Sequence, residues 1–383
     1  MTLMPRRRRH VLARITLAAA VASGAALAGC AGVPSAEKRL ESSPVDFRDY
    51  IALGYRLDWR GLPFVGLDQD IAVVQPVGGV VAVIETGGSI TIIEDGTGRN
   101  RATNALGGTF DTYLGAGQVG TDLLVLTDTE LFIVDSSTGA LTGRESLDRL
   151  ATTPPTLNGR IAIYGSNDGQ IVAHLVGQDI RMGGNRVNGP IDQPAVLIPE
   201  QNAVGIASRN GDVLFANADG LRRIGQGRMF GGPGAPLTSG RGLVYIASTD
   251  QSLYAFDPIG GVIVWRHRTE YPLRHRPAFH NDRVYTTLRQ SGLTAFDAST
   301  GDVLWEQPSA RGEVVSIRGN RLICWDGDTR TAYSVERLTG DVVETVALPS
   351  VSRFFRNEGD PIEEAIIYTT TDAHVLGKFV PAN

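Results

Sequence analysis

Cysteine is almost absent from this sequence, which has only Cys30 and Cys324 among its 383 residues. If Cys30 is modified, as its surroundings indicate below, no intramolecular disulfide can form. Cys324 lies in the apolar run 322–325, a position typical of a buried free thiol that packs like a small apolar side chain. Disulfide bonds are therefore not expected to stabilise the fold.

Aromatic and charged residues are also scarce, at 7% and 20% of the chain, whereas glycine is frequent, with 46 residues. The apolar residues come in short, β-branched runs, which are typical of strands. With 42% hydrophobic residues the chain has enough apolar material for a large core, and disorder is not expected. The composition favours an all-β globular protein.

Sequence motifs for catalysis and metal binding are missing as well. The six histidines include no His-Glu-x-x-His or other ligand spacing, and the chain has no Gly-x-Ser-x-Gly elbow and no Walker-type loop. His267, His275 and His280 cluster in one polar stretch, where we expect solvated loop positions. Residues 326–328 faintly resemble a calcium loop but fall where a hairpin turn is predicted. We therefore expect no catalytic residue, no metal and no cofactor.

Residues 1–29 are typical of an export signal. An arginine-rich start is followed by an apolar, alanine-rich stretch over residues 15–28, which is too short to span a bilayer stably. The stretch ends in Leu27-Ala28-Gly29-Cys30, which resembles the bacterial lipobox. This resemblance implies cleavage before Cys30, acylation of that cysteine and anchoring in lipid. The alternative is a plain signal peptide followed by an incidental cysteine.

The residues around the cleavage site also bear on location. Ala31 follows the cysteine, and the absence of an aspartate there implies sorting to the periplasmic face of the bacterial outer membrane. Arg8-Arg9 loosely resembles a twin-arginine signal, so the export route stays open. Loss of residues 1–29 removes five arginines and no acidic residue, which changes the formal charge from −5 to −10. A protein this acidic is a poor nucleic-acid binder.

Beyond the leader, residues 30–50 are small, polar and charged, and predict a lipidated tether with a short helical turn near residues 45–50. The rest of the chain is repetitive. Residues 255–265 (AFDPIGGVIVW) and 295–305 (AFDASTGDVLW) are forty residues apart. Together with weaker copies, these segments give aligned glycines at positions 98, 139, 220, 261, 301 and 340, and a degenerate copy is expected near residues 176–177.

A second column of eight tight turns, such as Asn210-Gly211, separates pairs of apolar runs. Each period therefore contains four antiparallel strands, which is one propeller blade. The eighth hairpin lacks an outer strand, and residues 56–59 look like an orphan outer strand, so their pairing would close the ring and remove an exposed edge. The sequence predicts an all-β, eight-bladed β-propeller over residues 51–383, closed by an N-terminal strand on the C-terminal hairpin.

The repeat Ala-x-Asp-x-x-Thr-Gly-x-x-x-Trp resembles the tryptophan-docking repeat of the pyrroloquinoline-quinone-like propellers. By this resemblance Asp257 and Asp297 hold turns, whereas Trp59, Trp265 and Trp305 wedge between neighbouring blades. These five residues are therefore interpreted as structural.

Two branches of that superfamily bear on function. Quinoprotein dehydrogenases hold a quinone and Ca²⁺ in the central channel, usually with a vicinal disulfide, but this chain has no adjacent cysteines and no recognisable calcium ligand set. The BamB lipoproteins consist of a lipobox, a tether and one eight-bladed propeller. This second resemblance implies a non-enzymatic scaffold, monomeric within a larger complex, that assists outer-membrane β-barrel assembly by docking on the BamA subunit. A propeller lipoprotein that binds another envelope protein or a polysaccharide remains the alternative, ahead of a quinone-dependent oxidoreductase.

Two segments have the composition of a partner contact. Residues 265–277 hold four arginines in an otherwise acidic protein, and Leu273, Arg274 and Arg276 are loosely similar to the Leu-Arg loop that BamB proteins present to BamA. Phe354 and Phe355 are adjacent, so both cannot face one core from a strand. The alternative in each case is an ordinary loop, solvated or tucked against the fold.

Overall fold

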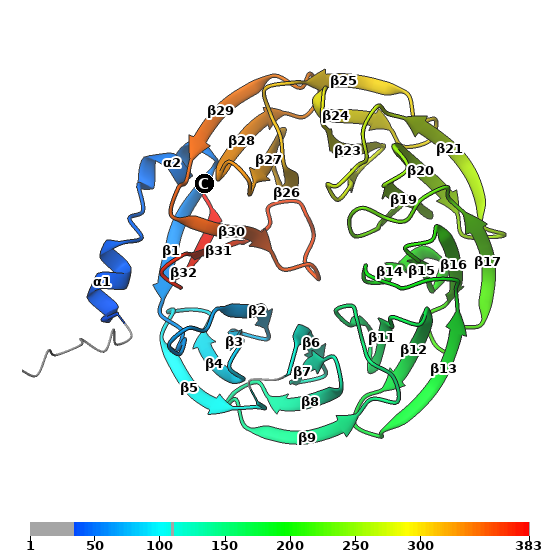
Figure 1. The fold of residues 1–383 in the computed structure, drawn as a ribbon. Coiled ribbons are helices and arrows are strands. Elements are labelled where there is room, and N and C mark those ends of the chain that lie inside the picture. The colour runs from blue at the N-terminus through cyan, green and yellow to red at the C-terminus, as the bar shows by residue number, and fades with distance from the viewer. Residues whose placement is uncertain (1–33, 109–110, 383) are drawn as a thin grey trace, which may run out of the picture. The chain divides into compact units, whose positions relative to one another are not determined.

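The computed structural model describes residues 34–108 and 111–382. Within this part of the chain, 32 strands form eight four-stranded antiparallel sheets. The sheets are arranged radially as the blades of a ring, with the chain running once around it (Figure 1). The predicted eight-bladed propeller with four antiparallel strands per blade is therefore confirmed.

Seven blades take four consecutive strands each, from the inner to the outer edge. Blade 1 consists of β2 (Ile71–Val77), β3 (Val80–Glu85), β4 (Ser89–Glu94) and β5 (Asn100–Ala105). Blade 2 consists of β6 (Tyr113–Val119), β7 (Asp122–Thr127), β8 (Glu130–Asp135) and β9 (Leu141–Ser146). Blade 3 consists of β10 (Thr156–Asn158), β11 (Ile161–Gly165), β12 (Gln170–Leu175) and β13 (Ile180–Arg186). Blade 4 consists of β14 (Val196–Ile198), β15 (Ala203–Ala207), β16 (Asp212–Asn217) and β17 (Arg223–Arg228), with the 3₁₀ turn η1 (Pro199–Gln201) after β14.

The remaining blades follow the same order. Blade 5 consists of β18 (Thr238–Gly240), β19 (Leu243–Ser248), β20 (Ser252–Asp257) and β21 (Val262–Arg268). Blade 6 consists of β22 (Ala278–His280), β23 (Arg283–Leu288), β24 (Gly292–Asp297) and β25 (Val303–Gln307). Blade 7 consists of β26 (Glu313–Arg318), β27 (Arg321–Asp326), β28 (Thr331–Glu336) and β29 (Val342–Ala347). Blade 8 consists of β30 (Val351–Arg356), β31 (Ile367–Thr371), β32 (Leu376–Pro381) and β1 (Tyr55–Gly61).

Blade 8 closes the ring, because its outer strand β1 comes from the N-terminal end of the propeller. Tyr55 pairs with Pro381 and Gly61 with Leu376, and a bulge lies between Leu57 and Trp59. This pairing was predicted from residues 56–59 and the eighth hairpin. It joins segments more than 300 residues apart, so the ring cannot open without breaking a sheet.

The core lies between neighbouring blades. Middle strands such as β3 and β15 are buried along their whole length, whereas the outer strand β5 is mostly exposed. Both faces of each middle strand pack against another sheet, which explains why these segments are continuous apolar runs instead of alternating ones. Phe215 of blade 4 and Phe256 of blade 5, for example, have ring centroids 6.1 Å apart in one shared cluster.

The connections divide between two rims. One rim, called here the hairpin rim, carries the turns between the second and third strands of each blade and the connections from one blade to the next. The other, the repeat rim, carries the Asp-x-x-Thr-Gly turns between the third and outer strands. In the blade 6 turn, Asp297 Oδ1 accepts hydrogen bonds from the backbone N–H groups of Ser299 and Thr300, and Gly301 has a φ of 76°. In blade 5, Asp257 Oδ1 likewise accepts one from Ile259.

The tryptophans of three outer strands dock on the repeat turn of the next blade. Trp265 Nε1 donates to Ala298 O, Trp305 Nε1 to Arg337 O, and Trp59 Nε1 to Asp95 O, at 2.9, 3.1 and 2.6 Å. Each acceptor lies three residues before the turn glycine, and the indole packs on that glycine. In blades 3 and 4 a glycine of the outer strand instead brings the next blade's backbone into direct contact, as at Gly183 and Gly225.

Residues 35–52 pack against blade 8. They form α1 (Ala36–Glu41) and α2 (Phe47–Ala52), the second close to the predicted helical turn. Arg39 donates to Ala373 O, His374 O and Pro63 O, and Tyr50 stacks on Phe379 with ring centroids 3.8 Å apart. The sequence predicted a tether over residues 30–50, but its part from Ser35 onward is attached to the propeller. Among the described residues, no helix is both long and apolar enough to cross a membrane.

Candidate binding surface on the hairpin rim

A groove lies on the hairpin rim between blades 5 and 6. Its walls are residues 267–273, which are the end of β21 and the start of the connection after it, and residues 287–291, which are the end of β23 and the turn before β24, together with Glu306. The groove encloses about 330 Å³. It coincides with the arginine-rich stretch 265–277 that the sequence marked, so the predicted segment does line a concave surface.

An aromatic–guanidinium pair crosses this groove. The guanidinium carbon of Arg289 lies 4.6 Å from the ring centroid of Tyr271, and Gln290 Nε2 donates to Glu270 Oε2. Half-buried His267 lines the same groove with its ring edge-on to Phe296, at a centroid distance of 4.9 Å. Burial lowers the pKa of His267, while the charge of Glu306 acts in the opposite direction. The exposed basic side chains that line the groove are Arg268 and Arg289.

A second pair lies on the same rim, in the connection between blades 4 and 5. Phe230 is 83% exposed, and the Arg266 guanidinium lies between its ring and that of Tyr254, at 4.9 and 5.1 Å. Asp250 Oδ2 fixes this arrangement, because it accepts hydrogen bonds from Phe230 N, Gly231 N and the Tyr254 hydroxyl. An exposed phenylalanine held on an ordered turn, beside an oriented arginine, is the composition of a protein-binding hot spot.

The predicted contact residues of the first segment have different environments. Leu273 is only 2% exposed and packs in the core cluster of Tyr245 and Trp265, so its side chain is not available to a partner. Arg274 is exposed. Arg276 is half-buried and its Nη1 lies 2.7 Å from Glu358 Oε1. Of the three, Arg274 is thus the one presented to solvent, since Leu273 fastens the connection to the core.

The predicted phenylalanine anchors of the second segment are covered by the fold. Phe354 is buried and stacks on Trp325, with centroids 5.4 Å apart. Phe355 points to the other face of β30, where it is half-buried and stacks on Tyr368 at 6.1 Å. The two rings do face opposite sides, as strand geometry requires, but both sides are packed. Neither ring is an exposed anchor because each face of an inner strand meets another blade.

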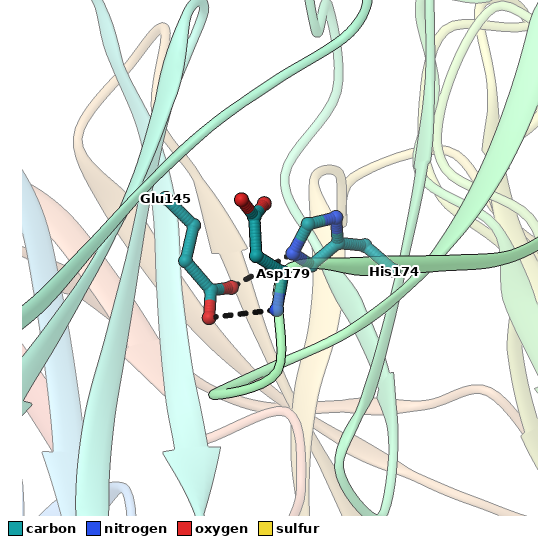
Figure 2. Close-up of side chains that lie close together, drawn as sticks. All are labelled: Glu145, His174 and Asp179. Carbon is teal, nitrogen blue, oxygen red and sulfur yellow. Dashed lines mark hydrogen bonds and ion pairs between the residues drawn. The ribbon is translucent and has the colours of Figure 1, made fainter.

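Three potential metal ligands lie close together between blades 2 and 3 on the repeat rim. Figure 2 shows Glu145, His174 and Asp179, whose ligand atoms lie within 4.8 Å of one another. Glu145 Oε2 is 2.7 Å from His174 Nε2, and Glu145 Oε1 accepts from the backbone N–H groups of Gly177 and Asp179. One carboxylate oxygen thus contacts β12 and the other holds the blade 3 turn, which lies where the degenerate repeat copy was predicted. This is a structural latch between two blades.

The connection between β30 and β31, residues 357–366, reaches toward the centre of the ring (Figure 1). It is held by blade 1, by the connection between blades 5 and 6, and by blade 6: Asn357 Oδ1 accepts from Gln75 Nε2, Glu358 pairs with Arg276, and Glu363 Oε1 lies 2.9 Å from His280 Nε2. Glu364 N also donates to Ile317 O. Acidic residues of this connection therefore cover Arg276 and His280, which lie just before and at the end of the inner strand β22.

Of the two cysteines, only Cys324 lies in the described part of the chain. Cys324 is fully buried in β27, and burial raises the pKa of its thiol, so it is a core residue without the exposure that a reactive thiol needs. Cys30 and the lipobox lie outside the described residues.

Comparison with solved structures gives the fold. BamB from Moraxella catarrhalis superposes with a TM-score of 0.65 at 15% identity, covering 84% of this chain and 97% of that one. Sqt1 from Saccharomyces cerevisiae gives 0.66 at 12% identity, with 84% and 100% covered, and the computationally designed protein Ika8 gives 0.68 at 12%, with 85% and 99% covered. At such identities the similarity concerns architecture alone, which many functions share.

Comparison with protein-family models finds a match over part of the chain. Residues 199–348 match the family model described as outer membrane protein assembly factor BamB. The chain is a BamB-like β-propeller. The matched residues run from the end of blade 4's inner strand through blade 7, and so include Phe230, Arg266, Tyr271 and Arg289.

The BamB-like propeller also has a curated relative of another kind. It is 24% identical over 144 residues to a quinoprotein ethanol dehydrogenase of Pseudomonas aeruginosa, a match that covers 35% of this chain and 22% of the dehydrogenase. The aligned part thus spans about a fifth of that enzyme.

Sequence reasoning missed Phe230 and Arg289, two exposed residues on the hairpin rim. Phe230 lies before Gly231-Gly232 in a connection between blades, where a large apolar residue has no strand to pack in. This position in the sequence could have indicated that Phe230 is exposed. No sequence feature pointed to Arg289, because a single arginine in a hairpin turn is common.

Proposed function

We propose that this protein is a non-enzymatic, lipid-anchored scaffold that assists assembly of outer-membrane β-barrel proteins through protein–protein contacts. The observation that carries the proposal is the match of residues 199–348 to the BamB assembly-factor model, because those residues contain the complete groove between blades 5 and 6. The exposed aromatic–arginine pairs there have the composition of interface hot spots.

The anchor in this proposal is acylated Cys30, placing the propeller on the periplasmic face of the outer membrane. The partner is a periplasmic protein region, with the BamA subunit as the first one to test. The protein acts as a monomer within the larger complex. The residues proposed to touch the partner are on the hairpin rim and are called the contact surface below: Phe230, Arg266, Tyr271, Arg274 and Arg289.

Affinity purification of the full-length protein from detergent-solubilised membranes tests this function. The variant Phe230→Ala/Tyr271→Ala/Arg289→Ala removes three members of the contact surface. The control variant Arg223→Ala/Leu338→Ala removes exposed side chains on the repeat rim. A hot-spot aromatic contributes about 2 kcal/mol or more, which is over tenfold in affinity. The native protein and the control should recover barrel-assembly subunits, and the triple variant should lose them. Recovery of no such subunit by the native protein would contradict the proposal.

A quinone-dependent oxidoreductase is the second candidate, and the match to the quinoprotein ethanol dehydrogenase favours it. Such enzymes, as the sequence resemblance implies, hold their cofactor in the central channel of their propeller; in this chain, residues 357–366 reach toward the centre of the ring. The absorbance spectrum of the purified protein, recorded before and after incubation with pyrroloquinoline quinone and Ca²⁺, separates the two functions. A bound quinone spectrum would favour the enzyme.

A further inference from the structure

We propose that the hairpin rim of blades 8 and 1 contacts the lipid bilayer directly, through Phe64 and Leu67. These residues lie in the connection from β1 to β2 and are 49% and 55% exposed. The proposal rests on the lipid anchor at Cys30 that forms part of the proposed function. It adds which edge of the propeller faces the membrane.

The chain between anchor and propeller is short. Ser35, the N-cap of α1, follows Cys30 by five residues. Even a fully extended chain of that length spans only about 18 Å. An acylated Cys30 at the bilayer surface therefore keeps the start of α1 within that distance of the lipid, and the propeller cannot move away from the membrane.

The start of α1 is fixed to one edge of the ring. Arg39, one helical turn after Ser35, is buried and donates to Ala373 O and His374 O of the blade 8 hairpin and to Pro63 O of the connection to blade 1. Arg60 Nη2 adds bonds to Leu40 O and Ser43 O. α1 is thus held at Arg39 beside Pro63, the residue directly before Phe64.

The connection presents its two apolar side chains from a firm base. Val65, between them, is buried, and Phe64 N donates to Thr91 Oγ1 at 3.1 Å. Gly66 N donates to Glu85 Oε2 at 2.6 Å. Because the intervening backbone is tied to blade 1, Phe64 and Leu67 remain outside the core. A tether converts a weak contact into an intramolecular one at high effective concentration, so two apolar side chains suffice.

Charge near the patch favours a zwitterionic surface. Asp68 and Asp70 follow Leu67 and are exposed, with His374 Nε2 3.4 Å from Asp70 Oδ1. Carboxylates at this edge would be repelled by an anionic bilayer. The occupant that fits is therefore a bilayer rich in zwitterionic headgroups, such as phosphatidylethanolamine.

The chain supplies a matched control for this surface. Ile51 in α2 is 55% exposed, the same as Leu67. It precedes the start of β1, whereas Leu67 follows its end, and a strand of seven residues is about 23 Å long. A membrane that meets the hairpin rim of blade 8 at Leu67 therefore lies well away from Ile51.

The test uses the full chain, expressed with its own leader, purified from membranes and reconstituted into phosphatidylethanolamine–phosphatidylcholine vesicles. The variants Leu67→Cys and Ile51→Cys are each labelled with an environment-sensitive fluorophore; Cys324 is buried and does not compete for the label. The fluorophore at position 67 should shift to shorter wavelength and be quenched by lipids that carry a spin label in the upper acyl chain. The fluorophore at position 51 should show neither effect.

The intact mass of the same samples distinguishes failure of the lipid anchor from failure of the membrane contact. Acylated protein whose fluorophores at 67 and 51 respond alike would overturn the membrane contact and leave the anchor in place. A mass without acyl chains would overturn both the anchor and the contact, whereas recovery of barrel-assembly subunits is measured independently. Addition of Phe64→Ser to the labelled Leu67→Cys chain should reduce quenching, and unchanged quenching would argue against a shared contact.

Discussion

Trp265 reaches from the outer strand of blade 5 to the repeat turn of blade 6, where its indole N–H donates to the carbonyl oxygen of Ala298 over 2.9 Å. The same ring covers Gly301, the last residue of the Asp-x-x-Thr-Gly turn. One hydrogen bond and one glycine contact thus couple two blades, and the pair recurs at Trp59 and Trp305.

Replacement of Trp265 by alanine should destabilise the propeller strongly. The side chain is 8% exposed, and truncation of a buried tryptophan to alanine costs about 3–5 kcal/mol through the cavity it leaves. Urea unfolding followed by far-ultraviolet circular dichroism measures the change. Val303→Ala, at a 40% exposed position of the next outer strand, serves as control and should change stability little. Equal effects of the two substitutions would contradict the docking role.

Gly301→Ala should cost more than Gly120→Ala. Both glycines have positive φ, of 76° and 62°, so backbone strain of about 1–2 kcal/mol applies to each. A methyl group on Gly301 would lie 2.6 Å from Cδ2 of Trp265, whereas one on Gly120 would meet nothing within 4 Å. The difference between the two variants in free energy of unfolding therefore isolates the docking contact. If both variants lose the same free energy of unfolding, the Trp265 ring accommodates the added methyl group without cost.

Glu145→Gln should weaken the latch between blades 2 and 3. The glutamine keeps the size but not the charge that serves His174 and the two backbone N–H groups of the blade 3 turn. Loss of a hydrogen bond to a buried charged group costs about 1.5–3 kcal/mol. The melting temperature should fall for the variant and stay unchanged on addition of a chelator or of Zn²⁺ to the native protein. A large rise with Zn²⁺ would instead favour a metal site.

Stability should fall in mild acid through His267. Burial lowers the pKa of this imidazole in the folded protein below the ordinary value of about 6.5 that applies to the unfolded chain. Between the two values the unfolded chain binds a proton that the folded chain does not, so the free energy of unfolding decreases as the pH drops below about 6.5. His267→Gln should reduce this decrease. Urea unfolding of both proteins at neutral and mildly acidic pH checks the prediction, and identical slopes would contradict it.

The sequence predicted the repeat-level features because they are local and recur. Asp297 and Gly301 lie within one turn, and the same spacing recurs around the ring, so a single chain carries several independent copies of the signal. The strand carrying Trp59 was recognisable as the missing outer strand by comparison with the other blades. Its pairing with β32 follows from the need to complete the last sheet.

The predicted contact residues depended on packing that no local pattern records. Leu273 and Phe354 had the composition of exposed anchors, but the surrounding blades bury both. Phe230 is 83% exposed, and Asp250 of a neighbouring hairpin accepts a hydrogen bond from its backbone N–H. Arg39 and Tyr50 belong to a segment of tether-like composition, yet contacts with residues more than 300 positions away attach it to blade 8.

Sequence alone therefore determined the architecture: all-β, eight blades, closure by β1, and the aspartates Asp257 and Asp297 that hold the repeat turns of blades 5 and 6. Tertiary structure decided which side chains reach the surface, where the N-terminal segment docks and which basic groups the 357–366 connection covers. Those outcomes depend on contacts between distant parts of the ring, and such contacts exist only once the blades have come together.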